Sequence, residues 1–198
     1  KSQPLHFVWN YTEADRRFWE EHLEDWVPER LVDAHTHIAD PARRKRPMTE
    51  TMRRQVWVHE LSEPIGPEDA ARCHRLVWPR RNVSCVCFGW PDLAFDIAGQ
   101  NRDLQQACPP RGWHALLLLR PEWDPGYVEA ELDRPGVIGV KPYYAMIGES
   151  ATTRDRYQEA SIFDFLPHPV LERLHRRRAW VTLHVPRAGR LPHPDNLR

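Results

Sequence analysis

Two histidines separated by one residue, His35 and His37, stand at the end of a short apolar run. Neutral imidazoles are common ligands of divalent metal ions, and two imidazoles on one side of a strand can hold the same ion. Side chains two residues apart share a strand face, so Asp33 is expected beside both histidines as a catalytic carboxylate. With 11 His in the chain, two ordinary hydrogen-bonded histidines are the alternative.

Two further candidate residues come at the ends of later apolar runs. Lys141 follows residues 137–140, and His184 lies in the run 180–185. If both runs are parallel strands, these side chains reach the rim where α/β barrels build their active sites. The alternatives are a Lys141 that extends to solvent and a His184 bonded to a backbone carbonyl. We interpret His184 as a third metal ligand and Lys141 as a catalytic residue. The residues expected to contact substrate are Arg120, Tyr143 and Trp90.

Hydrophobic patterns predict strands that alternate with helices along most of the chain. Helix patterns begin near Pro67, Asp96, Pro125 and Pro169. Such alternation is typical of a parallel sheet joined by right-handed crossovers. It fits the first five units of a (β/α)8 TIM-type barrel or a complete doubly wound sheet, and the absence of Gly-x-Gly-x-x-Gly after the first strand favours the barrel. The predicted strands are residues 31–38, 83–88, 113–119, 137–140 and 180–185.

Two segments lie outside this repeat. Residues 1–30 are expected to form an arm and a helix capped by Thr12, with residues 31–198 as the barrel domain. The connection 39–66 is long enough to cap the mouth of the site. Helical spacing predicts a packed face on the first helix, made by Phe18, Trp19, Leu23 and Trp26.

Composition narrows the classes of partner. The 28 basic and 28 acidic residues give a formal net charge of zero, so no overall field attracts nucleic acid or a membrane surface. The longest purely apolar run, residues 115–119, is far too short to cross a bilayer. A small-molecule substrate is expected, and a homodimer is possible. Cys85 and Cys87 lie two apart on one strand face, which disfavours a disulfide between them and favours free thiols in a reducing cytoplasm.

The motifs on three of the predicted strands together carry a family resemblance. The sequence Val-Asp-Ala-His-Thr-His-Ile over residues 32–38, with Gly-Val-Lys ending at Lys141 and Thr-Leu-His ending at His184, resembles the amidohydrolase superfamily. The most similar branch holds aminocarboxymuconate-semialdehyde decarboxylase, resorcylate decarboxylase and several barrel lactonases. The resemblance implies a (β/α)8 barrel in which His35, His37 and His184 bind the metal. It covers about five strands, and it implies a strand-six His and a strand-eight Asp beyond Arg198.

The resemblance implies a role for Lys141 that differs between branches. In binuclear members the strand-four lysine is carboxylated and bridges two metals. In the branch favoured here one metal is usual and the lysine holds substrate.

Three functions follow as hypotheses. The first is a metal-dependent hydrolase, in which a divalent ion, Zn²⁺ above others, activates water to cleave an ester, lactone or amide of a small anionic molecule. The second is a lyase of the same branch, a metal-dependent non-oxidative decarboxylase. The third is a non-catalytic α/β binding module. A structural zinc site usually has four ligands, often Cys at short spacing, and no Cys-x-x-Cys occurs here.

Overall fold

The computed structural model describes residues 10–50, 64–148 and 160–185 of the chain. The predicted arm before residue 10 lies outside the described residues. Residues 51–63, which form the central part of the predicted cap, also lie outside the described residues.

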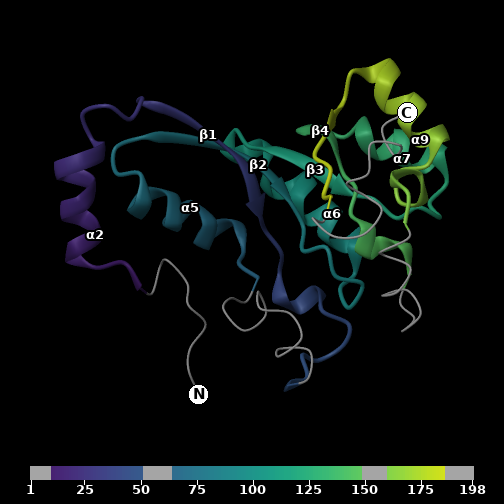
Figure 1. Ribbon diagram of the computed structural model, residues 1–198, viewed down its shortest axis with the longest axis horizontal. Helices are drawn as coiled ribbons and strands as arrows, with labels where there is room; N and C mark the ends of the chain where they lie inside the picture. The colour runs from purple at the N-terminus through teal and green to yellow at the C-terminus, as the bar shows by residue number, and fades with distance from the viewer. Residues whose placement is uncertain (1–9, 51–63, 149–159, 186–198) are drawn as a thin grey trace.

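The core of the structure is a five-stranded, all-parallel, curled sheet that forms a half-barrel (Figure 1). The strands follow one another in chain order, from β1 to β5. A doubly wound sheet reverses its strand order at a switch point, so this order supports the barrel alternative. All five predicted strands are confirmed as sheet segments. Their bounds are β1 (Arg30–His37), β2 (Asn82–Phe88), β3 (His114–Leu118), β4 (Val137–Lys141) and β5 (Trp180–Val181).

In the described residues, an α-helix lies between each pair of consecutive strands, as the alternation predicts (Figure 1). Helix α5 starts with Pro67 at its first position, where the missing N–H costs nothing. Helix α7 is capped by Asp124, whose carboxylate accepts hydrogen bonds from two backbone N–H groups. These helices are α5 (Pro67–Val77), α6 (Ile97–Ala107), α7 (Pro125–Leu132) and α9 (His168–Arg177), and shorter helical turns are η2 (Pro41–Arg43), η3 (Pro109–Arg111), η4 (Tyr144–Ile147) and η5 (Ile162–Asp164).

The first helix lies at the edge of the structure, next to the start of β1 (Figure 1). The predicted cap is present, because Thr12 and Asp15 bond each other's backbone and side chain at the start of α2 (Glu13–Phe18). The chain continues as the π-helical turn η1 (Trp19–Leu23). The predicted packed face is wrong in part, since Trp19 is 2% exposed but Phe18 and Trp26 are 56% and 69% exposed. Trp26 follows the end of η1 at Leu23, so helical spacing no longer determines the direction of its side chain.

Both faces of the central strands are covered by apolar side chains. Cys85 and Cys87 pack with Ala70 of α5 and Leu104 of α6 on the convex, helix-covered face. Val86 and Phe88 point the other way and pack with Leu116 on the concave face. Because both faces are buried, the sequences of these strands are nearly continuous apolar runs. No disulfide links the four cysteines, which all lie in the described part of the chain and are buried.

Pairing of the last two strands depends on a close backbone approach at Gly139. A Cβ at this position would lie 1.8 Å from the carbonyl oxygen of Trp180. Strand β5 is shorter than the predicted 180–185, but a bridge between Tyr143 and His184 continues its alignment with β4. The glycine therefore helps to place His184.

Replacing Gly139 with alanine is expected to separate β5 from β4, because a methyl group cannot occupy the space of a carbonyl oxygen. We expect the free energy of unfolding to fall by at least about 3 kcal/mol, at the upper end of overpacking effects. Urea titration followed by circular dichroism measures it. The control is Gly66→Ala, where no atom lies within 4 Å of the new Cβ. Equal loss in both variants would contradict the close-approach explanation.

Within the described part of the chain, no helix combines the length and apolar character needed to cross a membrane.

Candidate functional site

His35 and His37 lie together at the carboxyl end of β1. Their ring centroids are 5.4 Å apart. Both rings meet the edge or face of Phe88 on β2 at nearly right angles, at 4.8 and 4.5 Å. Because Phe88 belongs to the concave-face cluster, the two histidines face the interior of the half-barrel. The predicted pairing of the two imidazoles is therefore present.

Asp33 lies on the opposite face, so the expectation that it shares a side with the histidines is wrong. From Asp33 to Thr36, β1 advances three residues while β2 advances only from Cys85 to Cys87. This extra residue is a β-bulge, which reverses the alternation of side chains along the strand. The Asp33 carboxylate instead bonds His74 of α5, with 3.1 Å between Oδ2 and Nε2. The interaction with His74 lowers the pKa of Asp33 to about 2.

His37 is held in one tautomer by the backbone. Its Nδ1 lies 3.1 Å from the carbonyl oxygen of Gly89, so Nδ1 must carry the proton that is donated. Burial, with smaller effects from neighbouring cationic groups, lowers the pKa of His37 to about 4. The ring is therefore neutral at physiological pH, with a free electron pair on Nε2. Trp90 lies beside it, with 5.7 Å between the ring centroids, as expected for a residue at the mouth.

Lys141 is buried at the end of β4, where 1% of its surface is exposed. Its Nζ lies 4.7 Å from the centroid of the Phe88 ring, the same ring that the two histidines contact. Among the described residues, no carboxylate forms an ion pair with it. Burial lowers the pKa of Lys141 to about 8. The alternative of a strand-end lysine that reaches solvent is thereby contradicted.

His184 approaches the same region from the segment after β5. Its backbone N–H donates to the carbonyl of Pro142, with N and O 3.4 Å apart, and its ring lies 4.1 Å from that of Tyr143. Burial lowers the pKa of His184, and the charges of Lys141 and His35 lower it further. His184 therefore lies within electrostatic range of Lys141 and His35. Tyr143, an expected substrate contact, lies against His184.

Arg120 does not join this group. Its Nε donates to the Glu122 carboxylate, 2.7 Å away, and its guanidinium forms an ion pair with the same residue. The expected contact between Arg120 and a substrate carboxylate would therefore have to displace Glu122.

Two buried amides that sequence reasoning missed hold the strand ends in place. Gln100 accepts from the N–H of Trp90 at 2.7 Å and donates to its carbonyl at 3.2 Å. Asn101 makes the same pair of bonds with Leu118, both at 2.9 Å. These amides are 1% and 2% exposed. Both amides lie three or four residues before Leu104, on the buried side of α6. This spacing is the sequence signal that could have identified them as buried residues.

Replacing Gln100 with leucine is expected to remove the side-chain hydrogen bonds to the Trp90 backbone, although the Trp90 carbonyl still accepts from the Asp92 N–H. Loss of the partner of a buried N–H costs about 1 to 3 kcal/mol, so unfolding should become easier by about 2 kcal/mol. Because Gly89 positions His37 and immediately precedes Trp90, zinc affinity should also fall about tenfold. Urea titration measures the first effect, and calorimetric titration with Zn²⁺ measures the second. Gln105→Leu, on the same helix but bonded to Glu131, is the control; equal effects would show that the Trp90 bonds are not responsible.

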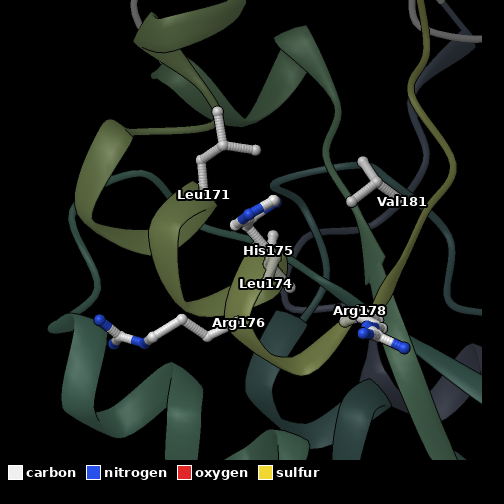
Figure 2. Close-up of a pocket in the computed structure, with 7 residues that line it drawn as sticks. Leu171, Leu174, His175, Arg176, Arg178 and Val181 are labelled. Carbon is white, nitrogen blue, oxygen red and sulfur yellow. The ribbon is translucent and has the colours of Figure 1, made fainter.

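Two hollows lie outside this site, and neither is lined by His35, His37 or His184. The larger, about 640 Å³, lies between the end of α9 and β5 (Figure 2). Figure 2 shows Leu171 and His175 of α9 on one side and Val181 on the other, with Arg176 and Arg178 extending in different directions. The smaller, about 140 Å³, lies between the loop after β1 and α6. In the described ranges, no three His, Cys, Asp or Glu side chains have an arrangement that could hold a metal ion.

Comparisons with known proteins found no relative of this chain. The chain matches no protein-family model, no curated protein and no solved structure. The functional interpretation therefore depends on the residues themselves.

Proposed function

We propose that this chain forms the first part of a metal-dependent hydrolase that cleaves an ester, lactone or amide bond in a small anionic molecule. The observation that carries the proposal is the grouping of neutral imidazoles around a buried lysine. His35, His37 and Lys141 all contact the ring of Phe88, and His184 interacts electrostatically with Lys141. In a parallel α/β structure, this end of the strands is where active sites are built.

The histidines have the chemistry that a divalent cation requires. A metal-binding imidazole must be neutral, and the pKa of each of the three is lowered. The bond from His37 to the Gly89 carbonyl is the kind of outer contact that orients a metal-binding histidine. We propose Zn²⁺, held by His35, His37 and His184, although the described geometry does not yet bring three donors to one point. When bound, the ion would lower the pKa of a water molecule and polarise a carbonyl.

Lys141 indicates the charge of the substrate. A buried ammonium without a carboxylate partner is costly, and an anionic ligand would relieve that cost. Its Nζ would bind the substrate's carboxylate and hold it next to the histidines. The rings of Trp90 and Tyr143 would pack against the body of the molecule. Asp33 has no part in this proposal, because its carboxylate bonds His74.

Non-oxidative decarboxylation is the second candidate, and the aromatic surroundings favour it. The partly exposed rings of Trp90 and Tyr143 offer flat apolar surfaces next to His37 and His184, which suit an aromatic acid. In that reaction Lys141 would hold the carboxylate that leaves. The two candidates use the same residues and differ in the bond that is broken.

The test is a comparison of products on the complete gene product, loaded with Zn²⁺ or treated with a chelator. Small lactones and esters bearing a carboxylate are assayed for hydrolysis, and hydroxybenzoates for release of CO2. We expect hydrolysis that requires the metal, and Lys141→Gln should raise KM for the anionic ester more than for its neutral analogue. Release of CO2 alone would establish the second candidate. Turnover that is insensitive to the chelator would refute both.

A further inference from the structure

A second cluster of reactive side chains lies on the convex face, where the proposed function does not use it. The Sγ atom of Cys85 is 3.5 Å from Nδ1 of His74, and Nε2 of His74 is 3.1 Å from Oδ2 of Asp33. The three residues come from β2, α5 and β1. They form a line from the core to the surface, because Cys85 is 0% exposed while the side chains of His74 and Asp33 are 13% and 37% exposed.

The arrangement favours a charged thiolate. An imidazole that contacts an acceptor at each nitrogen is a donor at both when it is protonated. Bonds to Asp33 and Cys85 raise the pKa of His74 to about 9. A hydrogen bond from Cys87, followed by the contact with His74, lowers the pKa of Cys85 well below its usual range despite burial. Thiolates, rather than thiols, react with electrophiles.

We propose that Cys85, His74 and Asp33 form a thiol-oxidation site, at which hydrogen peroxide oxidises Cys85 in preference to the other cysteines. The Cys85 sulfur attacks one peroxide oxygen, and an S–O bond forms as the O–O bond breaks. The departing hydroxide takes the proton from Nδ1 of His74 and leaves as water. Sulfur is oxidised to a sulfenic acid, and the peroxide is reduced. Asp33 holds the imidazole in position throughout.

The geometry also explains why the peroxide must be small. Cys85 lies on β2, against the His74 ring of α5 and opposite Asp33 of the neighbouring strand β1, and 0% of its surface is exposed. A small oxidant can reach such a buried sulfur more readily than a bulky alkylating reagent. Oxidation replaces the attraction between Cys85 and His74 by a neutral contact, which would loosen α5 from β2 on the face opposite His35 and His37.

The test measures the loss of each free thiol in the folded protein during exposure to hydrogen peroxide. Catalase stops the reaction, the protein is unfolded with N-ethylmaleimide, and peptide mass spectrometry counts the unmodified cysteines. Cys85 should be lost about tenfold faster than Cys87, which has the same 0% exposure. Equal loss of the two thiols would overturn the proposal.

Variants then test the role of the imidazole. His74→Gln should slow the oxidation of Cys85 about tenfold, because the thiolate loses its cationic partner. His22→Gln, on the exposed turn η1, should leave the rate unchanged. If His74→Gln does not fold, as judged by circular dichroism, Asp33→Asn replaces it and should slow the reaction by a smaller factor. A wild-type rate in whichever variant folds would refute the assignment.

Discussion

The zinc affinity of the His37→Ala variant is expected to be more than about 100-fold below that of the wild-type protein. Loss of an outer contact to a metal ligand already costs 10-fold to 100-fold, and loss of the ligand itself should exceed that. His37 is the strongest choice for this experiment because its tautomer is fixed by Gly89 and its pKa is about 4. It needs no proton release to bind a cation near neutral pH.

Competition titration with a chromophoric zinc chelator measures this affinity. The matched control is His114→Ala, since His114 is an exposed histidine on β3 at the opposite end of the same sheet. It should bind zinc as the wild type does. The variants should unfold at similar urea concentrations, because His37 is only partly buried. Wild-type affinity in His37→Ala would remove this residue from the metal site.

Replacing Lys141 with methionine is expected to stabilise the protein at pH 7 while it abolishes binding of anions. Burial lowers the pKa of Lys141 from 10.5 to about 8. Below pH 8 the Lys141 side chain is charged in both the folded and the unfolded protein. The folded protein then bears the full free-energy cost of burying this charge, on the order of 3 kcal/mol. Methionine has a similar length and no charge, so the cost disappears. The gain in stability would come at the expense of the proposed function.

The pH dependence provides a second readout for Lys141. Between pH 8 and about 10.5 the unfolded chain holds a proton that the folded chain has lost, so this residue makes stability rise with pH in that interval. The difference in unfolding free energy between Lys141→Met and wild type should therefore shrink as pH rises from 8 to 10.5. Lys45→Met, at an exposed position, is the control and should show no such trend. A destabilised Lys141→Met variant at pH 7 would contradict the interpretation.

The fold could be predicted largely because apolar periodicity reports burial directly. Residues 83–88 are apolar on both sides of the strand, and the structure buries them on both sides as β2. The helix starts at Pro67 and Pro125 follow from the fixed backbone of proline. The exposed Trp26 was mispredicted because the helical spacing was extended beyond Leu23, where η1 ends.

The site was predictable only in part, for a geometric reason. Strand-end position correctly placed His37 and Lys141 near each other, because parallel strands end at one rim. Asp33 was misplaced because a single extra residue in β1 reverses the alternation, and a bulge leaves no clear mark in the sequence. Gln100 was missed because a buried amide that bonds backbone resembles any polar residue of a helix until its partner is known.

The most direct test of the central claim is a long-range ¹H–¹⁵N spectrum of the imidazole nitrogens during titration with Zn²⁺. We predict that the signals of His35, His37 and His184 shift together and reach their end point at one equivalent of metal, while those of His114 stay unchanged. A His184 signal that does not respond, or one that shifts only after the His35 and His37 signals are complete, would contradict it.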